Sequence, residues 1–184
     1  MNIGLTQRVL LHRNRAYDAL EHGWYRYLQN HTLSTVANRT DQDFVALAEN
    51  LDALIITGGD DSAPRRATEI KIAKQMFLAN KPVIGICHGA FLLTDMFGGQ
   101  VVPAADHSDC DHSVYYFGEE RIVNSYHNLA IKQLHRNATE LVVDPQGHCE
   151  AWRDGMLAGV VWHPERQTQP WLPDEIQDLL KEKL

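Results

Sequence analysis

The sequence is poor in cysteine, in long apolar runs and in positive charge. Its three cysteines, Cys87, Cys110 and Cys149, are an odd number without the spacing of a disulfide framework, so at least one thiol is expected to be free. No apolar run approaches the roughly 20 residues of a membrane-spanning helix. The first residues also lack the basic and then apolar pattern of a signal peptide. We therefore expect a cytoplasmic protein with no membrane partner.

The scarcity of positive charge narrows the class of partner further. The chain has 24 acidic and 17 basic residues and a formal net charge of −7. Nucleic acids and anionic membranes bind basic surfaces, so nucleic acid is not expected as a partner either. An anionic small molecule would have to meet local arginines rather than an attractive field of the whole molecule.

What the first half of the sequence does contain is an alternation of strand and helix patterns. Apolar runs at 53–57 and 82–86 are typical of strands buried on both faces. Periodicity adds strands at 2–7 and 32–37 and helices at 15–29, 41–51, 64–79 and 88–97. This alternation predicts a parallel α/β sheet with right-handed crossovers. The 184 residues show no repeat or linker, so we expect one domain over 1–184.

The helix predictions include specific side chains. In the segment 15–29 the residues at helical spacing are Tyr17, Leu20, Trp24, Tyr27 and Leu28. Thr40 or Asp41 is expected to cap the helix over 41–51, whose inward face would hold Phe44, Leu47, Ala48 and Leu51. The helix over 64–79 is expected to bury Ile70, Ala73, Met76 and Phe77.

The second half of the sequence changes to short strands. They are predicted near 100–102, 113–117, 120–124, 129–132, 139–143, 149–153 and 157–162, and a last helix over 173–183. Arg153-Asp154-Gly155 is typical of a hairpin connection. The expected fold is therefore a flavodoxin-like, mixed, mostly parallel central sheet flanked by helices.

Cys87 stands between a buried strand and a helix, in Gly85-Ile86-Cys87-His88-Gly89. A residue at such a sharp turn points its side chain above the sheet edge, and a helix N-terminus favours a thiolate. Most free cysteines, however, are small buried core residues. From this segment alone, a nucleophile and a core cysteine remain equally open.

A second segment, Gly159-Val160-Val161-Trp162-His163-Pro164-Glu165, runs from a strand into a turn. A carboxylate two residues after a histidine can orient the imidazole and stabilise its charged form, as in a nucleophilic triad. Taken alone, His-Pro-Glu is more often a surface turn.

Together these segments resemble the class I glutamine amidotransferases, and within them the γ-glutamyl hydrolase (peptidase C26-like) branch. The resemblance covers nearly the whole chain, from the Gly58-Gly59 turn through Cys87 and Val123-Asn124-Ser125-Tyr126-His127 to His163-Pro164-Glu165. It implies the class I amidotransferase fold and a triad of Cys87, His163 and Glu165. It also implies an oxyanion hole made of the backbone N–H groups of Gly59 and His88, and a reaction that needs no cofactor.

The resemblance also implies substrate contacts. The Asn-Ser-Tyr-His loop lies near the glutamyl group in such proteins, so Ser125, Tyr126 and His127 are expected to contact the substrate. Gly58 of the Gly58-Gly59 turn is a further expected substrate contact. Ser125 and Asn128 are equally compatible with simple turn hydrogen bonds. Gln7 and Arg8 end the first strand and are placed to line the leaving-group side, although a solvated Arg8 is the commoner case.

The sequence departs from the family at Phe91, where glutaminase members usually carry a glutamine. This departure argues against free glutamine as the substrate. The first residues resemble amidotransferase-like proteins of bacterial capsule biosynthesis, which implies removal of a γ-glutamyl group from a nucleotide-linked phosphoramidate. Arg8, Arg65 or Arg66 would then meet a phosphate, unless these arginines are solvated.

The segment His107-Ser108-Asp109-Cys110-Asp111-His112 holds side chains that bind zinc. Zinc ligands usually come as two spaced pairs, and His148-Cys149 makes a poor second pair, so no metal is expected.

Three functions therefore stand side by side. The first is a stand-alone hydrolase that releases glutamate and a small amine or amidate. The second is a glutaminase subunit that supplies ammonia to a separate synthase partner. The third is a non-catalytic or metal-binding module on the same fold. The sequence does not determine the oligomeric state.

Overall fold

The computed structural model describes residues 1–104 and 108–181. Its central feature is a set of parallel strands that are buried on both faces. The order is β4, β1, β5, β6 and β13, and every neighbouring pair in this set is parallel. Their bounds are Thr32–Val36, Asn2–Thr6, Ala53–Ile56, Val83–Ile86 and Leu157–Val160. All four residues of β5, β6 and β13 are buried, as the apolar runs predict.

Antiparallel strands extend this sheet beyond β13. The order continues through β12, β11, β8 and β9, and β10 pairs with both β12 and β7. Their bounds are Cys149–Asp154 (β12), Thr139–Val143 (β11), Ser108–Tyr116 (β8), Glu119–Tyr126 (β9), Leu129–Gln133 (β10) and Gln100–Pro103 (β7). The predicted mixed, mostly parallel sheet is confirmed. So is the predicted hairpin connection, because Asp154 of β12 pairs with Leu157 of β13.

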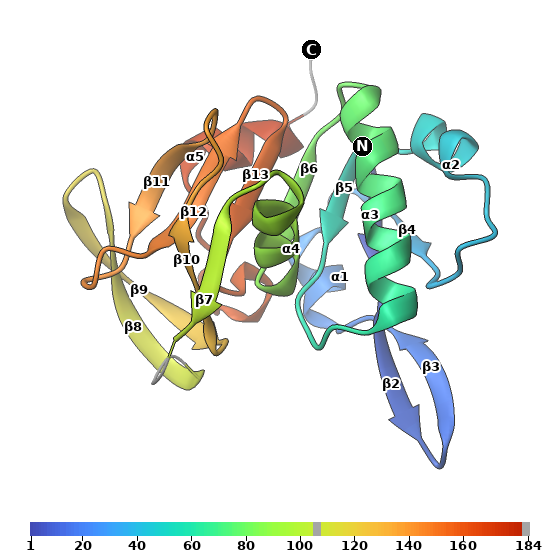
Figure 1. Ribbon diagram of the computed structural model, residues 1–184, viewed down its shortest axis with the longest axis horizontal. Coiled ribbons are helices and arrows are strands. Elements are labelled where there is room, and N and C mark those ends of the chain that lie inside the picture. The colour runs from blue at the N-terminus through green and yellow to red at the C-terminus, as the bar shows by residue number, and fades with distance from the viewer. Residues whose placement is uncertain (105–107, 182–184) are drawn as a thin grey trace.

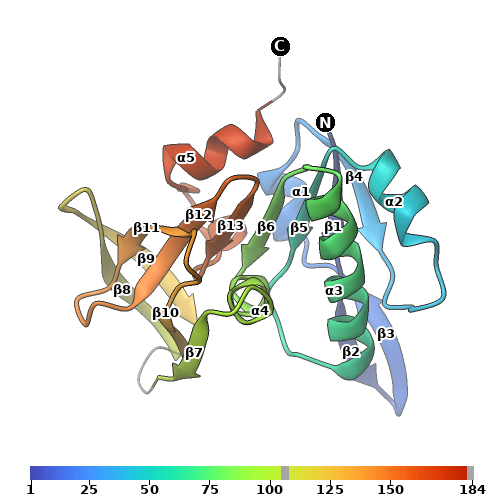
Figure 2. The same ribbon diagram turned by 45° about the horizontal axis from the view of Figure 1, so that its top comes forward.

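Helices cover both faces of the sheet. In Figure 1, α3 and α4 lie in front of the parallel strands, and α1 and α5 lie behind. Turning the molecule in Figure 2 keeps α4 over β6 and the β2–β3 hairpin outside the body. The helices are α1 (Gly23–Tyr27), α2 (Phe44–Asn50), α3 (Ala63–Leu78), α4 (His88–Met96) and α5 (Asp174–Gln177), with 3₁₀ turns η1 (Pro164–Arg166) and η2 (Asp178–Leu180).

The predicted helix over 15–29 is wrong in its first part. Residues Arg8–His12 (β2) and Arg15–Ala19 (β3) form an antiparallel hairpin, and only α1 is helical. The two turn residues, Arg13 and Asn14, both have positive φ, the conformation that matches the twist of a two-residue hairpin. Trp24 and Leu28 are buried as the pattern predicts, but Tyr17 lies exposed on the hairpin.

Three further predictions need correction. The second helix begins at Phe44, and its cap is Asp43, whose carboxylate accepts hydrogen bonds from the N–H groups of Val45 and Ala46. In α3, Phe77 is 48% exposed, and Ile72 fills the core instead. The last helix is short: α5 passes into η2, and 182–184 lie outside the described residues.

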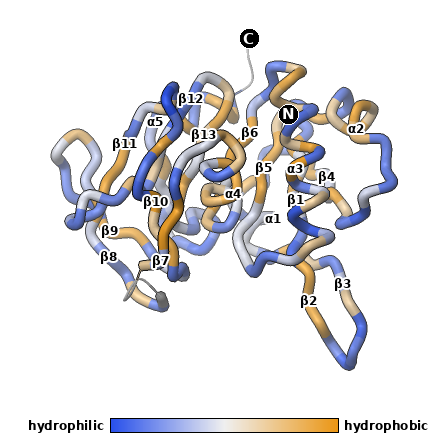
Figure 3. The backbone as a smooth tube through the Cα atoms, in the orientation of Figure 1, coloured by the Kyte–Doolittle hydropathy of each residue, from blue (hydrophilic) through white to orange (hydrophobic). Residues whose placement is uncertain are grey.

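The apolar core follows the parallel strands and α4, which are the orange inner segments of Figure 3, while the tip of the β2–β3 hairpin is hydrophilic. Within the described residues, no helix is long and apolar enough to cross a bilayer.

The carboxyl ends of β1, β5, β6 and β13 meet at one edge of the sheet because these strands are parallel. In open α/β sheets this edge is where ligands bind. The residues that follow it are Gln7, Thr57, Cys87 and Val161. Four of the chain's predicted site segments, Gln7-Arg8, Gly58-Gly59, Cys87-His88 and His163-Pro164-Glu165, therefore begin at or near the same edge.

Candidate active site

Cys87 occupies a strained turn between β6 and α4. Its φ of 51° and ψ of −105° lie outside the usual regions for a residue with a side chain. Its N–H continues the sheet by donating to the carbonyl of Val160 on β13, at 2.8 Å. A Cβ on Gly85 would overlap backbone atoms of α4, and a Cβ on Gly89 would overlap the Ile56 carbonyl of β5, so both positions require glycine. The sequence thus builds a tight elbow that presents the thiol at the sheet edge.

His163 and Glu165 follow β13 and are both buried. His163 is 2% exposed and Glu165 is 4% exposed, and His163 Nδ1 lies 2.7 Å from Glu165 Oε1. Pro164 starts the 3₁₀ turn η1, which returns the carboxylate toward the imidazole. Cys87 and His163 line the same cavity and interact electrostatically.

Burial disfavours a charged imidazole, but the surroundings of His163 outweigh it. Hydrogen bonds and charge interactions with Cys87 and Glu165 raise the pKa of His163 to about 9. The same carboxylate acts on Tyr27 of α1, whose pKa is raised by burial and by the charge of Glu165. The cysteine, histidine and glutamate therefore form one coupled buried unit.

Two neighbours fix the orientation of His163. Asn124 of β9 clamps its backbone: the amide Nδ2 donates to the His163 carbonyl at 2.9 Å, and the His163 N–H donates to Oδ1 at 2.8 Å. Gly58 packs directly on the ring, since a Cβ there would overlap Cε1 of His163. Gly58 thus supports the imidazole and does not line the cavity beside it. The sequence indicated that Asn124 lies in a substrate loop, but not that its side chain binds the backbone of His163.

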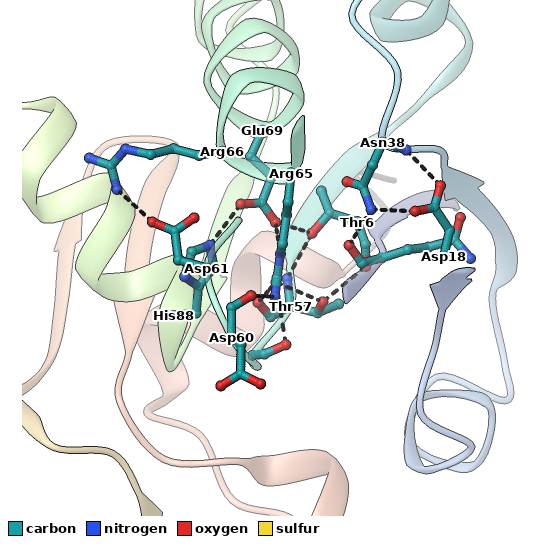
Figure 4. A network of polar contacts seen from close by, with 12 residues as sticks. Thr6, Asp18, Asn38, Thr57, Asp60, Asp61, Arg65, Arg66, Glu69 and His88 are labelled. Atoms are coloured by element: carbon teal, nitrogen blue, oxygen red, sulfur yellow. Dashed lines mark hydrogen bonds and ion pairs between the residues drawn. The ribbon is translucent and has the colours of Figure 1, made fainter. Parts of the chain in front are cut away.

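A buried ion pair on α3 holds the turn after β5 and the start of α4 (Figure 4). Arg65 and Glu69 are both fully buried, with Nε and Oε1 at 2.8 Å. The Arg65 guanidinium donates to the carbonyls of Thr57, Gly58 and Asp60. Glu69 Oε2 lies 2.8 Å from the His88 ring. Burial opposes ionisation of Glu69, but His88 and Arg65 keep its pKa below the usual value.

This network bears on the two expected oxyanion donors. Gly59 has a φ of 114° and stands in the turn that Arg65 holds. His88 is the first residue of α4, where a backbone N–H has no partner within the helix. Arg65 is therefore a positioning residue, and the expectation that it meets a phosphate is wrong because its guanidinium is fully engaged inside the protein.

A cavity of about 440 Å³ opens over Cys87 and His163. Of the expected substrate contacts, Tyr126 and His127 line it, as do Gly59 and His88. Phe91 also lines it and lies edge-on to the His127 ring at 5.7 Å between centroids. The remaining lining residues are Asp60, Asp61, Arg66, Leu92, Asp95, Val101, Asn128, Leu129 and Arg166. Ser125 is completely buried and is not among them.

The two expected contacts that follow β1, Gln7 and Arg8, bond to residues outside the catalytic unit. Arg8 donates to Glu21 at 2.8 Å, and the Gln7 carbonyl accepts from Asn38. Among the described residues that line the cavity, neither Gln7 nor Arg8 appears. The arginine that sequence reasoning missed is Arg166, which binds the same Glu21 and stacks over the Tyr126 ring at 4.6 Å. Its position directly after Glu165 was the available signal.

The second arginine of the cavity is Arg66, which stands next to the buried Arg65 on α3. It pairs with Asp95 at 2.6 Å and with Asp61 at 3.4 Å. Of the sequence cluster at 107–112, His107 lies outside the described residues, and Asp109 and Asp111 are exposed. His112 of this cluster contacts the ring of His127, which lines the cavity.

The arrangement provides a thiol on a strained elbow, an imidazole held by a carboxylate, and backbone N–H groups beside both. These groups together can support nucleophilic attack on a carbonyl group. A family model described as glutamine amidotransferase class-I matches residues 15–182. The chain belongs to this family. As a member of this family, it is a glutamine amidotransferase-type hydrolase.

The similar proteins include both hydrolases and synthase subunits. Gamma-glutamyl-CDP-amidate hydrolase of Campylobacter jejuni is 28% identical over 91% of this chain and 92% of its own length. The pyridoxal 5′-phosphate synthase subunit PdxT of a Geobacillus species is 27% identical over 67% of this chain and 77% of its own. GMP synthase of Helicobacter pylori is 31% identical over 61% of this chain but only 24% of its own length.

Solved structures agree on the fold. A putative GMP synthase protein of Thermoplasma acidophilum superimposes with a TM-score of 0.72 at 20% identity, covering 98% of this chain and 90% of that one. A glutamine amidotransferase of Thermotoga maritima gives a TM-score of 0.69 at 15% identity, covering 89% and 76%.

Proposed function

We propose that this protein is a cysteine hydrolase that cleaves a γ-glutamyl amide bond and releases glutamate and a small amine or amidate. Cys87 is the nucleophile, His163 the general acid and base, and Glu165 the carboxylate that orients the imidazole. The observation that supports this most is the buried Cys87–His163–Glu165 unit, which faces a single cavity.

In this proposal the Cys87 thiolate attacks the δ-carbonyl carbon of the γ-glutamyl group. The carbonyl oxygen becomes an oxyanion that accepts hydrogen bonds from the N–H groups of His88 and Gly59. One such donor contributes about 3 kcal/mol to transition-state stabilisation in comparable sites. Protonated His163 gives its proton to the departing nitrogen, and a glutamyl thioester with Cys87 remains. Neutral His163 then takes a proton from water, whose oxygen attacks the thioester and releases glutamate.

The leaving group is proposed to be an amidate of a phosphorylated nucleotide. The support is the likeness, over nearly the full length of both chains, to a protein that is named for hydrolysis of gamma-glutamyl-CDP-amidate. A second support is Phe91, which brings an apolar ring to the cavity at a position where glutaminases usually carry an amide. The charged side chains nearest to a phosphate in this cavity would be Arg66 and Arg166 rather than Arg8.

The test is glutamate release by the wild type and by Cys87→Ala. The substrates are free glutamine, a neutral γ-glutamyl alkylamide and a γ-glutamyl phosphoramidate nucleotide. We expect turnover of the two conjugates above that of glutamine, and loss of all turnover in the variant. Mass spectrometry of the wild type quenched during turnover should show a glutamyl adduct on Cys87. Turnover that survives in Cys87→Ala would contradict the proposal.

A second candidate is a glutaminase subunit, which the likeness to synthase subunits supports. It predicts turnover of glutamine alone by the isolated chain, with ammonia as the second product. An ammonia assay beside the glutamate assay separates the two functions.

A further inference from the structure

Three metal-binding side chains from distant parts of the sequence meet behind one wall of the cavity. They are His112 on β8, His127 just after β9, and Glu150 on β12. One ligand atom from each lies within 4.8 Å of the others. His127 is 5% exposed and Glu150 is 1% exposed, so this is an interior cluster and not a group of surface acids.

The spacing fits a small divalent ion. Two zinc ligands about 2.1 Å from the ion and at a tetrahedral angle lie about 3.4 Å apart. His112 Nε2 and Glu150 Oε2 are 3.6 Å apart, close to this value. The rings of His112 and His127 have their centroids 6.3 Å apart, so small side-chain rotations bring all three ligands to one centre.

The surroundings also prepare the ligands. His127 Nδ1 lies 2.7 Å from the carbonyl of Leu129. A ring N–H that donates to a carbonyl leaves Nε2 as the nitrogen without a proton, and metal-bound histidines are usually held in this way.

We propose that His112, His127 and Glu150 bind one zinc-like divalent ion. Two histidines and one glutamate are a known zinc ligand set, and they leave a fourth position for water or a small ligand. The ion would fix His127, which lines the cavity and packs against Phe91, and would thereby stiffen that wall. This site is separate from Cys87 and does not depend on the proposed reaction.

The experiment titrates metal-stripped protein with Zn²⁺ against a chromophoric chelator. The Cys87→Ser variant serves as the parent, because the thiolate and His163 could themselves bind zinc. We expect one equivalent of bound zinc in the parent and a rise in its melting temperature on addition of Zn²⁺. His112→Ala and Glu150→Gln, each made in the parent, should weaken zinc binding by more than about tenfold. Loss of a residue that only hydrogen-bonds to a zinc ligand already lowers metal affinity by about this factor.

His12→Ala is the matched control, because His12 is exposed on the β2–β3 hairpin and should leave zinc binding unchanged. Urea unfolding without metal checks that the variants are folded. If His112→Ala does not fold, the zinc affinity of Glu150→Gln alone decides the test. Less than one equivalent in the parent would overturn the proposal. So would equal zinc affinity in the parent and in the folded variants.

Discussion

The contacts of His163 couple its protonation to the stability of the fold. Despite burial, its contacts with Cys87 and Glu165 raise its pKa to about 9 in the folded state, against about 6.5 for an unperturbed histidine. A raised pKa means that the folded state holds the proton more tightly than the unfolded one. The stabilisation from this residue is therefore complete below about pH 6.5 and is lost as the pH rises through about 9.

We accordingly expect the urea midpoint of the wild type to fall between pH 6.5 and 9. The fall should be smaller in His163→Gln, which cannot take up this proton. Unfolding curves at half-unit intervals of pH measure the difference. Parallel pH profiles of the two proteins would show that the imidazole is not held in its charged form.

Gly58 offers a second prediction for a single residue. Alanine at this position would overlap the His163 ring and displace it. Because misplacement of a catalytic group by about 1 Å costs roughly 100-fold in rate, we expect kcat/KM of Gly58→Ala to fall by about this factor. Gly118→Ala is the control for backbone strain without displacement of the ring, since the positive φ of Gly118 disfavours alanine while no atom lies near the added Cβ. Equal activity of the two variants would contradict the role of Gly58.

The positions of single residues could be predicted where they follow a buried apolar run. Cys87 and His163 could be found because Gly85-Ile86-Cys87 and Trp162-His163-Pro164 each leave a buried apolar run. Asn124 and Glu69 could not be assigned their contacts. Each depends on which element lies next to it in space, β9 beside η1 or α3 beside α4, and local sequence does not contain this information.

Helix α3 shows how one element serves the site through two adjacent arginines. Arg65 is fully buried against Glu69, whereas the Arg66 side chain is 40% exposed on the cavity rim. Removal of one partner of a buried ion pair leaves an uncompensated charge, which costs about 3–5 kcal/mol. A solvent-exposed pair contributes only about 0–1 kcal/mol.

Arg65→Ala should therefore lower the free energy of unfolding by about 3–5 kcal/mol, and Arg66→Ala by less than about 1 kcal/mol. Urea unfolding of the three proteins at one pH provides the comparison. The two variants share a helix and a side-chain type, so a similar loss in both would mean that the buried network does not support the turn after β5.

The elements themselves were predicted best where they are buried on both sides. Strands β5, β6 and β13 could be predicted from their apolar runs alone. Strand β3 was mistaken for the start of a helix because Tyr17 and Trp24 fit helical spacing, although Tyr17 lies in β3 and Trp24 in α1. The Arg13-Asn14 turn was the missed signal. The inward face of α3 was also misjudged, because its buried residues include the charged Arg65 and Glu69, which periodicity of apolar residues does not count.

For the whole molecule, the net charge of −7 opposes an anionic substrate. The cavity does not reverse this sign: Asp60, Asp61 and Asp95 face two arginines, each of which already pairs with a carboxylate. A domain of this length has a radius of roughly 20 Å. The repulsion of a substrate with about two negative charges at that distance falls by about 1 kcal/mol when the Debye length shortens from 30 to 8 Å.

We therefore expect kcat/KM for a γ-glutamyl phosphoramidate nucleotide to rise by about fivefold between roughly 10 mM and 150 mM salt. A neutral γ-glutamyl alkylamide should show no such change, because it feels no net force from the charge of the molecule. Steady-state rates for both substrates across a NaCl series measure the ratio. A decrease for the anionic substrate would mean that Arg66 and Arg166 act as uncompensated charges, and that the local field of the cavity outweighs the field of the whole protein.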